Sequence, residues 1–169
     1  MTTLFPLFGT HLFPVATLPA TTDTVFLLVE DRALCTWLPF HQHKLVLVLA
    51  AMRHQADALR AAGFTVRYQR LDDAGNDGLF AAIAHELARG SYTRVRHFPP
   101  PGRRATALLA ATLGAAGVAV ETLPDAQFLT SLDEFDRHLR GGKPFLARFY
   151  RGVRERHRIL LDAAGGPRG

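Results

Sequence analysis

The chain has 169 residues, 48% hydrophobic and 21% charged, which is the composition of one ordinary globular domain. No apolar run reaches the roughly 18 residues that a membrane span needs, and the start MTTLFPLFGTHLF lacks the positive charge of a signal peptide. The single cysteine, Cys35, excludes an internal disulfide and a four-cysteine metal or iron–sulfur site in these residues. We therefore expect a soluble, cytoplasmic protein, and the net charge of +5 leaves an anionic partner open.

Five short segments have the pattern of strands. The clearest runs from Thr24 to Glu30 (TVFLLVE), a continuous apolar run typical of a parallel strand that is covered on both faces. The other four are Leu4–Phe8, Phe64–Arg70, Tyr92–Phe98 and Val118–Thr122.

Helical patterns separate these strands. In His43–Ala62 the spacing of the apolar residues favours a helix, which Gly63 would end. Asp77–Arg89 follows, with Asp77 as the expected N-cap. The remaining predicted helices are Gly102–Ala116, Leu132–Arg140 and Pro144–Leu161, the last two divided by Gly141-Gly142.

Strands that alternate with helices indicate βαβ units and a parallel sheet. The crossovers of such units are almost always right-handed, so helices should cover both faces. We therefore predict an α/β fold with an open, Rossmann-like sheet of about five strands. Residues 1–162 would form this domain, and the glycine- and proline-rich residues 163–169 would begin a linker.

Ligands of such sheets bind outside the carboxyl ends of the strands, which directs attention to the loops there. Gly9-Thr10-His11 would let a ligand approach the backbone closely, or it is a simple turn. Glu30-Asp31 would accept hydrogen bonds from a ligand, or it is a solvated surface pair. No GxGxxG follows the first strand, which argues against a dinucleotide bound in the usual Rossmann manner.

Two further loops combine aromatic or basic residues. Cys35–Lys44 (CTWLPFHQHK) contains Trp37, which suits a flat heteroaromatic ligand or else packs against its own domain. Its histidines, His41 and His43, are weak evidence for a metal. Phe98–Arg104 (FPPPGRR) would hold a phosphate or a DNA backbone, or simply exposes its arginines.

The carboxy-terminal segment is strongly basic. Arg148, Arg151, Arg154 and Arg158 lie on the last predicted helix, interleaved with aromatic residues. Such a face binds nucleic acid or docks against a protein surface, and docking is the interpretation we favour. No motif for a nucleophile–base pair, a zinc protease or a P-loop is present, so these residues alone specify no enzyme.

Several segments together resemble the deoxyribodipyrimidine photolyase-related family, the iron–sulfur bacterial cryptochromes and (6-4) photolyases. Lys44–Asp73 looks like the family's signature stretch, in which Ala51-Met52-Arg53-His54, Val66-Arg67-Tyr68, Asp72-Asp73 and then Asn76 match. Phe128-Leu129-Thr130-Ser131, Glu134-Phe135, Arg148-Phe149-Tyr150-Arg151 and Leu160-Leu161 match later family segments.

This resemblance implies an amino-terminal antenna domain that binds 6,7-dimethyl-8-ribityllumazine. FAD, a four-cysteine [4Fe–4S] cluster and the DNA lesion would belong to a helical domain that these residues lack, so the lyase activity of the family would not be carried by this chain alone. DNA would be a partner only through such a parent protein.

Carried over by position, the antenna site would comprise Gly9, Thr10, His11, Glu30, Leu34, Trp37, His41 and Val48. Gly9, Glu30, His41 and Val48 match the family. Trp37 replaces its usual tyrosine. Thr10 and His11 replace an acid and an amide, and Leu34 replaces a glutamate expected to bond the lumazine ring.

Two functions follow as hypotheses. The first is an antenna domain of a protein for light-dependent DNA repair or light sensing, which is not catalytic alone. The second is a free-standing, non-catalytic relic or interaction module that binds nucleic acid or a protein partner through its basic last helix. An exposed docking face on that helix would also predict self-association.

Overall fold

The computed structural model describes residues 2–140, 145–162 and 165–166. The chain forms two compact units, Met1–Leu123 and Pro124–Gly169, which are described separately here. The expected division at Gly141-Gly142 and most of the expected linker at 163–169 lie outside the described residues. In the described ranges no helix is both long enough and apolar enough to cross a membrane.

The first unit contains a five-stranded sheet in which every neighbouring pair is parallel, as expected. Its strands are β1 (Thr2–Pro6), β2 (Thr24–Val29), β3 (Thr65–Gln69), β4 (Tyr92–His97) and β5 (Ala119–Thr122), in the order β3-β2-β1-β4-β5. The chain moves outward from β1 to β3 and then crosses to the other side of β1. The order therefore reverses between β1 and β4, where ligands of open α/β sheets bind.

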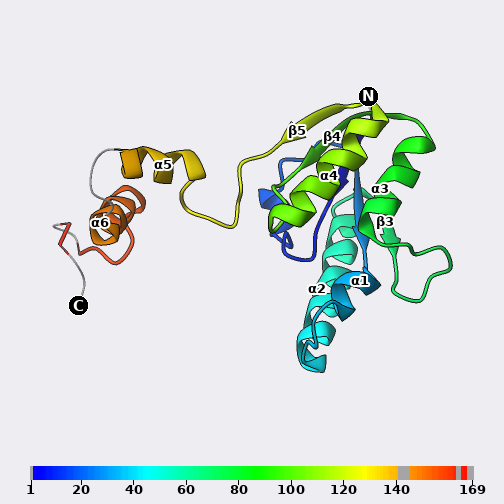
Figure 1. Ribbon diagram of the computed structural model, residues 1–169, viewed down its shortest axis with the longest axis horizontal. Helices are drawn as coiled ribbons and strands as arrows, with labels where there is room; N and C mark the ends of the chain where they lie inside the picture. Colours follow the sequence, from blue (N-terminus) through cyan, green and yellow to red (C-terminus); the bar gives the residue numbers. More distant parts are fainter. Residues whose placement is uncertain (1, 141–144, 163–164, 167–169) are drawn as a thin grey trace. The chain divides into compact units, whose positions relative to one another are not determined.

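Helices cover both faces of this sheet (Figure 1), as predicted. Leu4, Leu27 and Val95 point from the strands toward α3 (Leu79–Ala88) and α4 (Arg103–Ala116). Phe5 and Phe26, one residue along each strand, point to the opposite face and pack with α2 (Gln42–Ala61). This alternation is the period of two that extended backbone imposes, and it explains why the central strands are apolar throughout.

Two local predictions near these helices are wrong. The loop predicted at 35–44 begins inside a short helix, α1 (Arg32–Thr36), which Asp31 caps. Asp77 is not the N-cap of α3, because Gly78 occupies that position with a φ of 92°. The carboxylate of Asp31 accepts the amide of Leu79 instead, at 3.0 Å, so the cap comes from 48 residues upstream.

The second unit contains α5 (Leu132–Arg140), with its predicted bounds, and α6 (Leu146–His157). Helix α6 ends before the predicted Leu161, because Arg158 and Leu160 adopt a positive φ of 53°. Its predicted start, Pro144, lies outside the described residues. A reciprocal pair caps α5: Ser131 Oγ accepts the amide of Glu134, and Glu134 Oε2 accepts the amide of Ser131. Within the unit, the ring of Phe149 on α6 packs against Phe135 on α5.

Candidate functional site

Glu30, the first residue after β2, has a fully buried side chain. Arg53 on α2 donates two hydrogen bonds to it, from Nε to Oε1 at 2.6 Å and from an Nη to Oε2 at 3.0 Å. Tyr68 on β3 donates its hydroxyl to Oε1 at 2.7 Å, and the amide of Leu71 donates to Oε2 at 2.9 Å. A carboxylate has about four acceptor positions. All of them are used within the protein, so Glu30 organises its surroundings and has no lone pair left for a ligand.

This network fixes the charge of its members. Burial alone would raise the pKa of Glu30, but the hydrogen bonds from Arg53, Tyr68 and Leu71 outweigh it and lower the pKa to about 2. The hydrogen bond to Glu30 raises the pKa of Arg53 further. Burial, followed by the bond to Glu30, raises the pKa of Tyr68. At neutral pH the centre is therefore a carboxylate, a guanidinium and a neutral phenol.

Asn76 and Asp31 extend the same network through the backbone. The amide nitrogen of Asn76 donates to the carbonyls of Glu30 and Arg70, at 2.9 and 2.6 Å. Asp31 accepts the amides of Leu34 in α1 and Leu79 in α3. Both residues of the Glu30-Asp31 pair are buried, so the alternative of a solvated surface pair is wrong. The pair holds the loops at the carboxyl ends of β2 and β3 together.

The loop after β1 approaches α2 closely at Gly9. A Cβ atom on Gly9 would lie 3.3 Å from both Val48 Cγ1 and Met52 Sδ, so a larger residue would crowd the helix. Thr10, the next residue, is exposed. The structure thus brings Gly9 and Val48 together, with Thr10 beside them in the sequence.

His11 lies in an aromatic cluster at the switch point of the sheet. Its side chain is fully buried, and its ring packs edge-on against Phe8 and Phe98 and parallel to Phe13. Phe98 is the first residue after β4, so the cluster joins the carboxyl ends of β1 and β4. His11 therefore stabilises the two loops and has no exposed surface to offer a ligand.

The remaining predicted site residues lie around the junction of α1 and α2. Leu34 is 53% exposed and Trp37 is 64% exposed, so the alternative that Trp37 packs into its own domain is wrong. His41 caps α2, its Nδ1 accepting the amide of His43, and the two rings are 4.7 Å apart. Among the residues that the structure describes, no group of three potential metal ligands forms here or elsewhere.

Several exposed apolar residues lie close to Trp37 in the sequence. We define the α1–α2 apolar surface as Leu34, Trp37, Leu38, Val46 and Leu47, each between 48% and 70% exposed. Because α1 follows β2 directly, this surface belongs to the carboxyl edge of the sheet. Isolated exposed apolar residues are ordinary, but a concentration within 14 residues is typical of a binding surface.

The basic residues predicted elsewhere have different surroundings. Arg103 and Arg104 are exposed in the first turn of α4. Arg148 and Arg151 are exposed along α6, whereas Arg154 donates to the carbonyls of Ile159 and Leu160 and so holds the segment that follows the helix. Arg158 lies beyond the helix, as its C-cap. The expected basic face is thus reduced to Arg148 and Arg151 on the helix itself.

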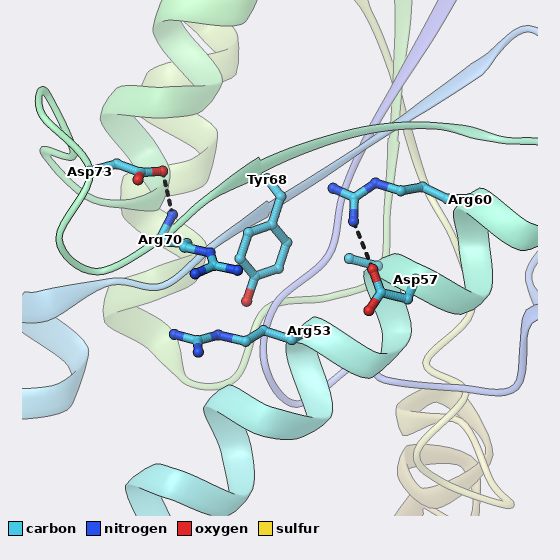
Figure 2. A pocket seen from close by; sticks show the side chains of 7 residues that line it. Arg53, Asp57, Arg60, Tyr68, Arg70 and Asp73 are labelled. Atoms are coloured by element: carbon cyan, nitrogen blue, oxygen red, sulfur yellow. Dashed lines mark hydrogen bonds and ion pairs between the residues drawn. The ribbon is translucent and has the colours of Figure 1, made fainter.

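A cleft of about 250 Å³ lies beside the Glu30 network, between α2 and the end of β3. Figure 2 shows Arg53, Tyr68 and Arg70 grouped together in it, with Arg60 and its ion-pair partner Asp57 nearby. This cleft is not evident from the sequence, because the fold brings its residues together from α2 and from the end of β3.

The sequence of the chain matches a known family along almost its whole length. The model of the family described as "Deoxyribodipyrimidine photo-lyase-related protein" matches residues 6–169. This chain belongs to the deoxyribodipyrimidine photolyase-related family. A protein described as a (6-4) photolyase from Agrobacterium fabrum (strain C58 / ATCC 33970) is 32% identical over 142 residues, which are 83% of this chain and 28% of that relative.

Residues that match the family form the Glu30 network. The matched stretches that carried the resemblance include Arg53, Tyr68 and Asn76, and all three bond to Glu30. From the sequence, these residues were recognised as matches to the family, but their structural role was not predicted. Their role depends on pairs that are 23 to 46 residues apart in the chain, which local patterns do not reveal.

Proposed function

We propose that the chain is the antenna-chromophore-binding domain of a photolyase-related protein that acts in light-dependent DNA repair or light sensing. The observation that carries the proposal is the α1–α2 apolar surface at the carboxyl edge of the sheet, with an aromatic ring, Trp37, that its own domain does not cover. The family membership supplies the context.

The residues present fit a flat heteroaromatic ligand such as 6,7-dimethyl-8-ribityllumazine. The exposed ring of Trp37 offers a stacking face, and Val48, half-buried beside Gly9, offers an aliphatic wall. Gly9 keeps the loop after β1 close to α2, which leaves the exposed Thr10 free to bond a polar edge of the ligand. The bound chromophore would absorb light and pass the excitation on.

Glu30 acts indirectly in this proposal. Its carboxylate is saturated by Arg53, Tyr68 and Leu71, so it positions the ends of β2 and β3 and does not touch the ligand. The polar contacts would then come from the exposed residues Thr10 and His41. FAD, a [4Fe–4S] cluster and the DNA lesion would be bound by further sequence of a longer parent protein, since this chain spans 28% of the relative's length.

The proposal is tested by an absorption titration of the purified chain with 6,7-dimethyl-8-ribityllumazine. We expect a shifted and saturable band near one ligand per chain, which is lost in Trp37→Ala. Tyr150→Ala is the matched control, because Tyr150 is also exposed (59%) but lies on α6 in the second unit. The absence of a saturable change at high ligand concentration would contradict the proposal, as would equal binding by both variants.

A second function is supported by a separate observation on α6. Arg148 and Arg151 are exposed, and in the part of the chain that the structure describes no acidic partner is recorded for either. Together with the exposed Phe145 and Tyr150, they would form a face that binds nucleic acid or a protein partner. Binding of DNA that weakens steeply with salt, and that is lost in an Arg148→Gln, Arg151→Gln double variant, would support this function.

A further inference from the structure

The cleft beside the Glu30 network has the chemistry of an oxyanion site. We name it the arginine cleft and define it by Arg53 and Arg60 on α2, with Tyr68 on β3 and Arg70 directly after it. Arg53, Asp57 and Arg60 are spaced by four and three residues, so they lie on one face of the helix and point to the same side. Arg70 approaches from the carboxyl end of its strand, where ligands of parallel sheets bind.

A buried carboxylate fixes the orientation of the Arg53 guanidinium. Two of its donors bond Glu30, which is fully buried, while 46% of the arginine side chain stays exposed to the cleft. A guanidinium has five N–H donors in a rigid plane. The donors that Glu30 does not use therefore lie in an orientation that is already fixed, and a ligand that accepts from them loses little further side-chain entropy.

Arg70 supplies a second guanidinium without an acidic partner of its own. Among the described residues no ion pair is recorded for its side chain. The nearest acid in the cleft, Asp73, accepts the backbone amide of Arg70 at 2.8 Å and so is directed at the turn. Figure 2 shows the Arg70 side chain extending toward Tyr68 and Arg53.

Two of the three arginines in the cleft form ion pairs, and the third has none recorded among the described residues. Arg53 is balanced by Glu30, and Arg60 is balanced by Asp57 at 2.9 Å. Arg70 is the cation whose side chain remains available for an incoming group, and the free donors of Arg53 lie in the same cleft. Two guanidinium groups that converge on one space favour a tetrahedral oxyanion, which each of them can bind with two hydrogen bonds.

The size of the cleft limits what such an oxyanion is attached to. About 250 Å³ is less than the roughly 300 Å³ at which pockets for drug-sized ligands begin, so we expect any group attached to a bound oxyanion to be small. Tyr68 presents its ring beside the two arginines, although its hydroxyl is used by Glu30. A sugar phosphate or a comparably small ester meets these limits.

We propose that the arginine cleft binds the phosphoryl group of a small phosphate monoester, with Arg53 and Arg70 as the principal donors. This site is separate from the α1–α2 apolar surface and does not depend on chromophore binding. The Glu30 network supplies two residues of this cleft, Arg53 and Tyr68. An occupant of the arginine cleft would therefore contact the same arginine and tyrosine that hold the carboxyl edge of the sheet together.

The test is isothermal titration calorimetry of the full chain with inorganic phosphate and with ribose 5-phosphate, at constant ionic strength set with chloride. We expect saturable binding near one ligand per chain, and a dissociation constant that rises about tenfold or more in Arg70→Gln. Arg70→Gln should fold normally, because no bond to the Arg70 side chain is recorded in the described structure. Arg89→Gln, which alters an exposed arginine outside the cleft, is the matched control and should bind as the parent does.

Three outcomes would overturn the proposal. The first is no saturable binding of either ligand, and the second is equal binding by Arg70→Gln and the parent. The third is binding of a short single-stranded oligonucleotide without any binding of ribose 5-phosphate, which would assign the arginines to a nucleic acid backbone.

Discussion

In helix α2 the more apolar half is the more exposed one, and the more polar half is the buried one. The first half, which includes Val46 and Leu47, is strongly apolar, yet these two side chains are 65% and 70% exposed. The second half is rich in polar residues, yet it contains all the buried residues of the helix, Met52, Ala56 and Leu59. The second half holds the domain together, through its core contacts and through Arg53. In the first half, Val48 and Leu49 pack against the core, whereas Val46 and Leu47 stay exposed and are available for the external contact that we propose.

The largest effect is expected at the centre of the second half. Glu30→Gln should lower the free energy of unfolding by about 3–5 kcal/mol, because the amide replaces one oxygen of the fully buried carboxylate by a donor that faces two other donors. Asp72→Asn, an exposed acid in the neighbouring turn, should change it by less than about 0.5 kcal/mol. Urea unfolding followed by circular dichroism measures both, and equal effects would show that the network has no special weight.

The comparison within α2 is tested directly by two leucines of the same helix. Leu59→Ala should cost about 2–5 kcal/mol, because Leu59 is fully buried in the core. Leu47→Ala should cost less than about 0.5 kcal/mol, because that side chain is already in water. The same urea unfolding measurement applies. A large loss of unfolding free energy in Leu47→Ala would mean that Leu47 stabilises the fold and is not available to a ligand.

Acid should reveal the Glu30 network without any substitution. The pKa of Glu30 in the folded protein is lowered to about 2 from its ordinary value of 4.5, so the folded state binds this proton less readily than the unfolded state. The resulting stabilisation, on the order of 3 kcal/mol, is fully present above pH 4.5 and is lost as the pH falls toward 2. Stability measured between pH 7 and pH 2.5 should fall less steeply in Glu30→Gln, and parallel profiles would contradict the assignment.

A smaller effect is expected at Asp31, which caps two helices. Asp31→Ala removes the acceptor of the Leu34 and Leu79 amides and should cost about 2 kcal/mol. Asp77→Ala should be close to neutral, since the structure gives the cap of α3 to Asp31 and not to Asp77. Thermal unfolding of the two variants separates these assignments, and a larger loss in Asp77→Ala would restore the cap that the sequence predicts.

The sequence predicted the fold better than the site. Apolar runs and helical spacing are local, and they placed the strands within about two residues and predicted a helix at 43–62, where the structure has α2. The strand order was not predictable, because it depends on which side of β1 the fourth strand pairs. The cap of α3 was missed because its acceptor comes from a residue near the start of α1.

For the site residues, too, local sequence does not decide which side chains the fold buries. Glu30 was selected as a ligand acceptor because it follows a strand at the carboxyl edge of the sheet, where ligands bind. Its burial depends on Arg53 and Tyr68, which reach it from elements later in the chain. His11 was selected for its polar ring, but the fold encloses it among Phe8, Phe13 and Phe98. Trp37 and Thr10 remain exposed at the edge, so the prediction that they contact a chromophore depends on those two more than on Glu30.

The fluorescence of Trp37 tests the central claim most directly, because it is the only tryptophan of the chain and lies in the proposed site. Before ligand is added, acrylamide should quench this fluorescence efficiently, since the side chain is 64% exposed. If the α1–α2 apolar surface binds 6,7-dimethyl-8-ribityllumazine, the ligand should protect Trp37 from acrylamide in a saturable manner. Unchanged quenching at ligand concentrations that exceed the protein many times would contradict the account.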